Sequence, residues 1–305
     1  MQKQPKSNTI NLAIGIVPHS VLVLIADEKG YFAEESLNVV MHEFSTGKMA
    51  LDSMLAGGTD MATTADFPIA LAGLAEQDFY VVASMGQGDD IKVIARKDSG
   101  INSISDLKGK RIATKKGGGG ELFMLKLFSQ EGIDLDSVSV IYLDPPEMPA
   151  AIARNDIDSY VIWEPHIANG EKEMGENAIV FSPKGIYGET WNIAARKDFA
   201  ERNPEKVKGF LRALLKADEF FRENREAGLE IAARHSGASL DTAKAVLDEF
   251  EIGVSLDNVL KEQVLEAAEF AVEQGIVKER EIPSFGGIFN TAFLEEIKPE
   301  SVETE

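Results

Sequence analysis

The chain has 305 residues, 44% of them apolar, which is enough to build two domains of ordinary size. Its 51 acidic and 31 basic side chains give a formal net charge of -20, and this field repels phosphate backbones and anionic lipid, so nucleic acid is not expected as a partner. The absence of cysteine excludes disulfides, thiolate metal sites and a cysteine nucleophile.

The N-terminal segment is polar. Residues 1–8, MQKQPKSN, lack the apolar core of a signal peptide, so we expect residues 1–9 to form a linker and the targeting segment to be absent from this chain. The longest uncharged run, residues 10–26, is shorter than the ~20 residues that a membrane helix needs, and it contains Pro18, His19 and Ser20. It predicts a buried strand, a polar loop and the start of a helix.

Short apolar strands alternate with amphipathic helices through the first two thirds of the chain, a pattern typical of an α/β protein with mostly parallel sheet. Strands are predicted at residues 10–17, 37–44, 60–64 and 79–85, with helices between them at residues 21–29, 48–56 and 67–75. The pattern restarts after Gly109, with strands at residues 111–114, 138–143 and 159–163 and helices at residues 120–130 and 147–154. A second lobe is therefore expected.

One internal repeat bears on how the lobes are connected. Residues 91–98 and 191–198 both end in Ala-Arg-Lys-Asp after an apolar strand. The repeat is either a coincidence or a pair of crossover strands, one leaving the first lobe and one returning to it. In the second case, lobe 1 comprises residues 10–95 and 195–305, and lobe 2 comprises residues 96–194.

The last third of the chain is predicted to contain only helices. They begin with Pro204, which suits a first helical turn, and would pack around the first lobe. Their expected ranges are residues 204–222, 226–235, 239–250 and 258–274.

Polar residues lie at or just beyond the ends of the predicted strands, where α/β proteins bind their ligands. These candidate ligand contacts are Pro18, His19, Ser20, Thr46, Thr63, Thr64 and Gln87. Each could instead be an ordinary residue of a turn or helix cap, as Ser20 and Thr46 are placed to be. None of the four histidines has the spacing of a metal-binding pair, so no metal site is predicted.

A glycine-rich turn between a strand and a helix is the most informative local feature. Lys116 precedes four glycines, of which Gly118, Gly119 and Gly120 lead into the predicted helix. Glycine lets the backbone approach a ligand closely, and the unpaired N–H groups of a helix start favour an anionic or strongly polar group. The alternative is a flexible turn without a ligand. Glu121 would compete with a bound anion unless its side chain points away.

Three aromatic residues could line the ligand. Trp163 ends a predicted strand, and Tyr187 and Trp191 lie near the second predicted crossover, where a cleft between lobes would open. Trp163 could equally belong to the core, and Glu164 is expected to charge the first turn of a helix. No nucleophile elbow or metal-binding histidine pair is present, so neither an enzyme nor a cofactor is predicted.

Several segments, taken in order, resemble one family of solute-binding proteins. They are residues 26–32 (ADEKGYF), 58–60 (GTD) through Pro68, 98–101 (DSGI) with 106–110 (DLKGK), the Lys-Gly-Gly turn, 157–158 (ID) with 163–165 (WEP), and 195–198 (ARKD). In this order the chain resembles the NMT1-like family, which includes aliphatic sulfonate, taurine, nitrate and thiamine-pyrimidine binding proteins.

The resemblance implies a type II periplasmic-binding-protein fold, with two α/β lobes, a ligand cleft and two crossover strands. It implies the solute-binding component of an ABC importer, a periplasmic or lipid-anchored extracytoplasmic monomer that serves a membrane permease and its ATPase subunit. The expected ligand is a small polar or anionic solute, with a sulfonate or taurine favoured over nitrate or a pyrimidine. A ligand-sensing input domain of a membrane receptor is the alternative.

In members of that family, the turn matching residues 116–120 commonly carries hydroxyl groups that hold a sulfonate. This chain has glycines there, so backbone N–H groups would have to serve instead. The implied cycle is closure of the two lobes around the ligand.

Overall fold

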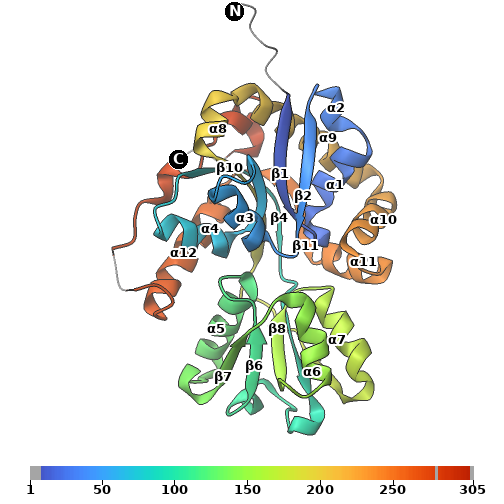
Figure 1. The fold of residues 1–305 in the computed structure, drawn as a ribbon, viewed down its shortest axis with the longest axis vertical. Coiled ribbons are helices and arrows are strands. Elements are labelled where there is room, and N and C mark those ends of the chain that lie inside the picture. The colour runs from blue at the N-terminus through green and yellow to red at the C-terminus, as the bar shows by residue number, and fades with distance from the viewer. Residues whose placement is uncertain (1–7, 279–280, 303–305) are drawn as a thin grey trace, which may run out of the picture.

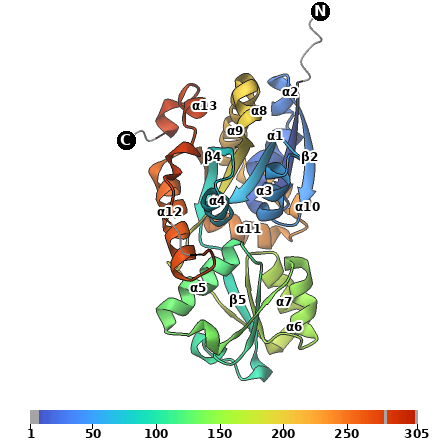
Figure 2. The same cartoon turned by 60° about the vertical axis from the view of Figure 1, so that its left-hand side comes forward.

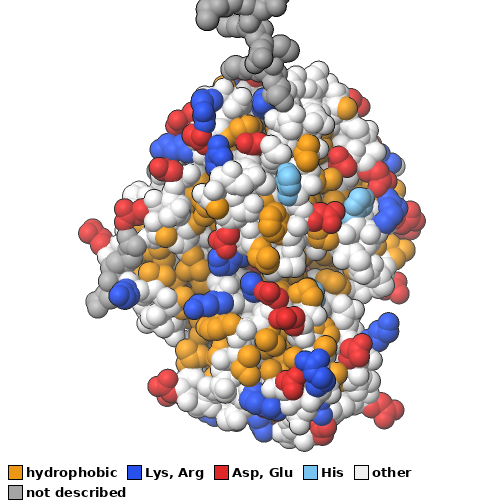
Figure 3. Space-filling model, viewed as in Figure 1, with side chains coloured by type: hydrophobic (Ala, Val, Ile, Leu, Met, Phe, Trp, Pro, Cys, Tyr) orange, Lys and Arg blue, Asp and Glu red, His pale blue; other side chains and the backbone are white. Residues whose placement is uncertain are grey.

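The computed structural model describes residues 8–278 and 281–302 and contains two separate sheets. The two lobes built on these sheets are stacked along the long axis of the molecule (Figures 1 and 2). On the face seen in Figure 3, charged side chains of both signs gather where the lobes meet. None of the helices in the described part of the chain is long and apolar enough to span a bilayer.

The larger lobe is built on a six-stranded sheet with the order β11-β4-β10-β3-β1-β2. Its strands are β1 (Thr9–Gly15), β2 (Asn38–Phe44), β3 (Met61–Ala65), β4 (Phe79–Gly88), β10 (Glu189–Arg196) and β11 (Phe250–Ser255). Strands β1, β2 and β3 are parallel, and β10 runs antiparallel to β3 and β4. The apolar side chains of β1 are fully buried, since helices cover both faces of this sheet.

Helices from both ends of the chain cover this sheet. On one side, α1 (Val21–Glu28) packs against α9 (Pro204–Glu223) and α10 (Arg225–Ser236); on the other, α4 (Asp66–Leu74) packs against α12 (Asn258–Glu273). The remaining helices of this lobe are α2 (Tyr31–Glu34), α3 (Gly47–Leu55), α8 (Lys197–Arg202), α11 (Leu240–Asp248) and α13 (Ala292–Glu295). The C-terminal helices therefore surround the first lobe, as the sequence predicts.

The smaller lobe is built on a five-stranded sheet with the order β7-β6-β8-β5-β9. Its strands are β5 (Lys92–Arg96), β6 (Arg111–Thr114), β7 (Ser139–Tyr142), β8 (Ser159–Ile162) and β9 (Ala178–Phe181). Helix α5 (Gly119–Glu131) lies on one side of the sheet, and α6 (Met148–Ala153) and α7 (His166–Met174) lie on the other (Figures 1 and 2). Strand β9 has no counterpart among the predicted elements, and α7 was predicted only as a helix start near Glu164.

The chain passes between the sheets twice, at residues 89–91 and at residues 182–188. Residues 92–95, which were expected in lobe 1, pair in the smaller sheet, and residues 189–194, which were expected in lobe 2, pair in the larger one. Each copy of the Ala-Arg-Lys-Asp repeat therefore lies at the end of the first strand after a crossing, which is β5 for the first copy and β10 for the second.

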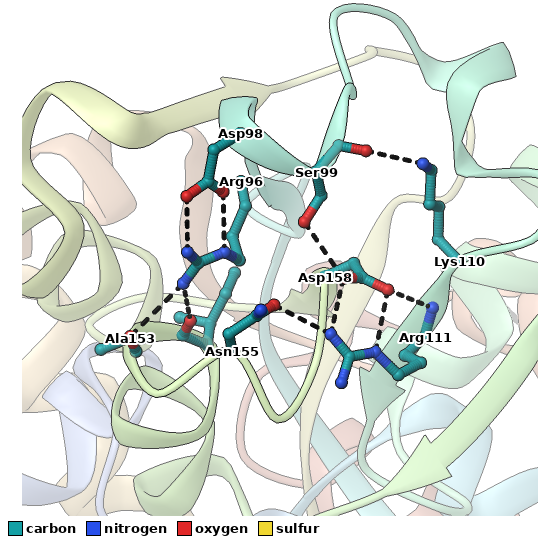
Figure 4. A network of polar contacts seen from close by, with 9 residues as sticks. Arg96, Asp98, Ser99, Lys110, Arg111, Ala153, Asn155 and Asp158 are labelled. Atoms are coloured by element: carbon teal, nitrogen blue, oxygen red, sulfur yellow. Dashed lines mark hydrogen bonds and ion pairs between the residues drawn. The ribbon is translucent and has the colours of Figure 1, made fainter.

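In both copies of the repeat, the arginine forms two hydrogen bonds with the aspartate two residues later. The pair Arg96–Asp98 belongs to the network at the end of the smaller lobe shown in Figure 4. The pair Arg196–Asp198 repeats this contact in the larger lobe. The shared motif thus stabilises the turn after a strand at two places in the fold.

The prediction that the last third of the chain contains no strand is wrong. Strand β11 pairs with β4 at the edge of the larger sheet, and α11 ends at Asp248 rather than at residue 250. Phe250, Ile252 and Val254 alternate with more polar or smaller residues, which is the two-residue period of a strand. At the other end, β1 begins at Thr9, while residues 1–7 of the predicted linker lie outside the described residues.

Candidate ligand-binding site

A cavity between the two lobes collects residues from the matching edges of both sheets. About 340 Å³ of space free of protein atoms lies there, part of it open to solvent. The larger lobe contributes Val17, His19, Thr46, Gly47, Lys48, Ala65, Pro68, Glu189 and Trp191, and the smaller lobe contributes Lys115, Gly118, Gly119 and Trp163. Most of these residues follow the carboxyl ends of parallel strands, while Glu189 and Trp191 open an antiparallel strand that starts at the same edge.

The structure brings together only part of the predicted set. His19, Thr46, Gly118, Gly119, Trp163 and Trp191 line the cavity. The residues of the predicted set that do not line it are Pro18, Ser20, Thr63, Thr64, Gln87, Gly120 and Tyr187. Gln87 pairs in the middle of the sheet with Thr190 and Glu251 because β4 continues to Gly88, and its side chain lines a different cavity.

Trp191 forms the floor of the cavity on the larger lobe. A side chain at Gly47 would bring its Cβ within 2.6 Å of the indole, so only glycine fits beneath it. The indole Nε1 donates to Ser20 Oγ at 3.1 Å, and Ser20 Oγ donates to the Gly15 carbonyl at 2.7 Å. Ser20 therefore positions the tryptophan and does not face the ligand space.

The predicted threonine hydroxyls also serve the fold. Thr46 Oγ1 accepts from the Met49 backbone N–H at 3.1 Å and caps α3, as the alternative interpretation expected. Thr63 Oγ1 accepts from the Gly15 backbone N–H at 2.9 Å and joins β3 to the end of β1. These hydroxyls hold the loops that form the cavity wall.

The glycine turn leads into α5 with Gly118 as its N-cap residue. Glu121 does not compete with a ligand there, because its carboxylate turns back and accepts from the Gly117 backbone N–H and the Tyr142 hydroxyl, both at 2.6 Å. Gly120 faces strand β8, where a Cβ would lie 2.7 Å from the Val161 carbonyl oxygen. The start of α5 is therefore open toward the cavity at Gly118 and Gly119.

The side chains of Trp163 and Glu189 on the cavity wall form no hydrogen bond within the described residues. The Trp163 indole Nε1 has no hydrogen-bond acceptor, and the Glu189 carboxyl receives no hydrogen bond. A Cβ on Gly119 would lie 1.9 Å from Glu189 Oε1, so this carboxyl sits directly against the start of α5. A buried polar group without a partner costs free energy, so both side chains are candidates for contact with a ligand.

Three buried acidic side chains lie at this edge of the larger sheet. His19 Nε2 lies 3.2 Å from Asp90 Oδ2, and Asp66 Oδ1 accepts from the Tyr187 hydroxyl and from the Phe67 backbone N–H. Burial raises the pKa of Asp66 to about 7, although the hydrogen bonds that Asp66 accepts lower it. Burial, with the nearby Asp90 and Asp66 carboxyls, raises the pKa of Glu189 well above its usual value.

Of the acidic residues at this edge, Asp90 and Glu189 escaped the sequence prediction, as did Lys48. A glutamate at the head of the buried strand ETWNIAAR is the one signal that could have revealed Glu189. Within the described residues, no group of three or more histidine, aspartate or glutamate side chains is placed to hold a metal ion. Glu164 lies just before α7 and not in its first turn, where it was predicted, but its Oε2 accepts from the Ala168 backbone N–H at 2.9 Å and so still serves the helix start.

Comparisons with known proteins agree with this architecture. A family model described as NMT1/THI5 like matches residues 17–228. A protein of Brucella abortus is 28% identical over 219 residues, which make up 70% of this chain and 66% of that protein, so the match spans just under two thirds of that relative. The taurine-binding periplasmic protein of Escherichia coli is 25% identical over 292 residues, 89% of each chain.

A solved structure shows the same fold. The alkanesulfonate-binding protein SsuA from Xanthomonas axonopodis pv. citri, bound to MOPS, matches with a TM-score of 0.80 at 18% identity, covering 94% of this chain and 100% of that one. Two lobes on separate sheets, two crossings of the chain and a cavity between the lobes agree with this likeness. The chain belongs to the NMT1/THI5-like family and has the fold of the periplasmic binding proteins.

Proposed function

We propose that this chain is the solute-binding component of an ABC importer, that it works outside the cytoplasmic membrane, and that it captures a small organic solute with an anionic head group of the sulfonate class. One observation carries the proposal. The open start of α5 and the unpaired Trp163 indole N–H face the same cavity between the lobes. The names of the taurine-binding and alkanesulfonate-binding relatives support this class of solute.

The start of α5 suits an acceptor group. The Gly118 N–H donates to the Lys115 carbonyl, whereas the N–H groups of Gly119 and Gly120 have no acceptor within the described residues, and the helix dipole adds partial positive charge at that end. Because Glu121 is turned away, no side chain of the first turn of α5 fills this position. An anionic head group at Gly118 and Gly119 could also accept from Trp163 Nε1, which otherwise stays unpaired.

Capture would proceed by movement of the lobes about the two crossings. Each lobe has its own sheet, and only residues 89–91 and 182–188 join them, so the lobes can move as units. A ligand that contacts both lobes stabilises the closed form, which a membrane permease would recognise, while the ATPase subunit supplies the energy for uptake. We expect the protein to act as a monomer in the periplasm or on a lipid anchor.

Calorimetry and thermal-shift measurements with alkanesulfonates, taurine, nitrate and a pyrimidine test this function. A ligand of the proposed class should raise the melting temperature, and the stabilisation should grow with the logarithm of the ligand concentration above Kd. Trp163→Phe keeps the aromatic ring but removes the donor, and it should weaken binding roughly tenfold. Failure of every sulfonate to bind would show that the proposed class is wrong.

A further inference from the structure

We propose that Glu189 binds the anionic head group of the solute as a neutral carboxylic acid, which donates a hydrogen bond to it, so that capture requires a proton as well as the solute. The inference rests on the function proposed above and adds a binding residue and a pH dependence to the same site. It starts from the position of Glu189 beside the open start of α5.

The Glu189 side chain lies where it would meet an anion bound at the start of α5. A Cβ on Gly119 would be 1.9 Å from Glu189 Oε1, and both residues line the cavity between the lobes. An ionised carboxylate at this position would repel a bound sulfonate and compete with it for the N–H groups of the helix start. A carboxylic acid has one O–H donor, and its presence beside the anion removes this conflict.

The acidic groups around Glu189 also disfavour its ionised form. Asp90 lies in the first crossing and Asp66 at the start of α4, and both act electrostatically on Glu189. The Glu189 side chain is only 3% exposed, and burial acts in the same direction, so the pKa of its carboxyl lies well above the usual value.

The basic side chains in this part of the molecule contact other acids. The pairs on the cavity wall are His19 with Asp90, Lys48 with Asp52, and Lys115 with Asp144. Lys126 on α5 pairs with Glu266, and the Tyr187 hydroxyl donates to Asp66. Within the described residues, Glu189 thus has neither an ion pair nor a hydrogen bond that would stabilise a carboxylate.

A proton on Glu189 links the affinity for the solute to pH. Water supplies the proton, which stays on the Glu189 carboxyl in the complex, because a sulfonate accepts a hydrogen bond without becoming protonated at neutral pH. Above the pKa of Glu189 in the free protein, the carboxylate must take up one proton before the anion binds. The affinity should then fall by up to about tenfold for each pH unit.

Isothermal titration calorimetry with ethanesulfonate from about pH 6 to about pH 10 tests this inference. Ethanesulfonate has no group that titrates in this range, so a change in affinity belongs to the protein. The wild type should lose affinity as the pH rises. Titrations in two buffers of different ionisation enthalpy, at a pH within this fall, should show uptake of up to one proton per bound anion.

Three variants complete the experiment. Glu189→Gln keeps the size of the side chain and a donor that does not titrate, so it should bind ethanesulfonate without the loss at high pH. Asp90→Asn removes a nearby negative charge and should move the fall in affinity to lower pH. Glu251→Gln, at an exposed residue outside this cavity, should keep the wild-type profile.

The outcomes separate the role of Glu189 from the proposed function. Equal pH profiles of the wild type and Glu189→Gln would overturn the role of Glu189 and leave the proposed function standing. If Glu189→Gln does not fold or bind, the wild type decides: proton uptake on binding supports the role, and its absence overturns it. Failure of ethanesulfonate and every other sulfonate to bind at any pH would contradict the proposed function, and the role of Glu189 with it.

Discussion

Two groups of buried or half-buried carboxylates in this protein have opposite surroundings. At the far end of the smaller lobe, Asp158 accepts from the Arg111 backbone N–H, from the Arg111 guanidinium and from the Ser99 hydroxyl (Figure 4). At the cavity, Glu189 and Asp90 form no hydrogen bond within the described residues, and Asp66 leaves one oxygen unpaired. The carboxylate in the smaller lobe has several hydrogen-bond donors, whereas the carboxyls at the cavity have too few.

The pKa values follow this difference. Hydrogen bonds from Arg111 lower the pKa of Asp158 to about 2, whereas burial raises the pKa of Asp66 to about 7. A carboxylate with enough donors stabilises the fold, and one without them reduces stability until a ligand or a proton compensates it. The comparison therefore separates a structural network from the site that we propose binds the ligand.

The largest expected effect concerns Asp66. Its pKa is raised from 3.8 to about 7, so between these values the folded protein holds a proton that the unfolded chain has released. The unfolding free energy should therefore fall as pH rises through this window, and Asp66→Asn should remove this part of the pH dependence. Relative to the wild type, the variant should gain about 4 kcal/mol across the window. Urea unfolding at several pH values measures this unfolding free energy. If it changed with pH in the same way in the wild type and the variant, the pKa of Asp66 would not be raised by folding.

Asp158 should behave in the opposite way. Asp158→Ala leaves the donors of Arg111 and Ser99 without their acceptor and should cost about 2 kcal/mol of unfolding free energy at neutral pH. Because the folded pKa is about 2, the contribution is present above pH 3.8 and is lost as pH falls toward 2. The control is Asp156→Ala, whose exposed pair with Arg154 should contribute less than about 0.5 kcal/mol. If both variants lost the same unfolding free energy, the Asp158 network would contribute no more than an exposed ion pair.

Two adjacent glycines test how tightly Glu189 is held against α5. A Cβ at Gly119 would lie 1.9 Å from Glu189 Oε1, whereas a Cβ at Gly118 has no neighbour closer than 3.4 Å. Gly119→Ala should therefore displace the carboxyl, weaken ligand binding and cost about 1–2 kcal/mol of stability, with Gly118→Ala nearly neutral. Thermal unfolding and titration of both variants provide the measurement. If the two variants had similar stability and ligand affinity, the Glu189 side chain would be able to move away from α5 without cost.

The smallest effect is expected at a contact between the lobes outside the cavity. Lys126 on α5 pairs with Glu266 on α12 at 2.6 Å, and thus joins the smaller lobe to the larger one. The pair is partly exposed, so Lys126→Met should lower stability by less than about 1 kcal/mol. Losing this contact between the lobes should affect ligand dissociation more than stability, and stopped-flow experiments should show a faster dissociation rate. Lys216→Met, which breaks a pair with Glu34 inside the larger lobe, should leave that rate unchanged.

Much of the fold follows from local pattern in the sequence. The alternation of strands and helices, the glycine turn and the C-terminal helices lie close to their predicted positions, because each depends on residues near one another in the chain. The errors have physical reasons. Strand β11 was missed because its alternation is short, and Gln87 was misplaced because β4 continues for three residues beyond its predicted end.

The site was harder to predict than the fold. Strand ends identified His19, Thr46 and Trp163, because parallel strands share a carboxyl edge. Glu189 was missed because β10 runs antiparallel, so its first residue and not its last lies at the cavity. Periodicity does not reveal the direction of a strand.

By itself, the sequence determined an acidic, two-lobed α/β protein of the NMT1/THI5-like family with an open glycine-rich helix start. The tertiary structure alone decided that Glu121 turns away from that helix start and that, within the described residues, Trp163 Nε1 lacks an acceptor and Glu189 forms no hydrogen bond. The reason is physical: composition and periodicity depend on neighbours along the chain, whereas the hydrogen bonds and charges around a buried group depend on segments that only folding brings together.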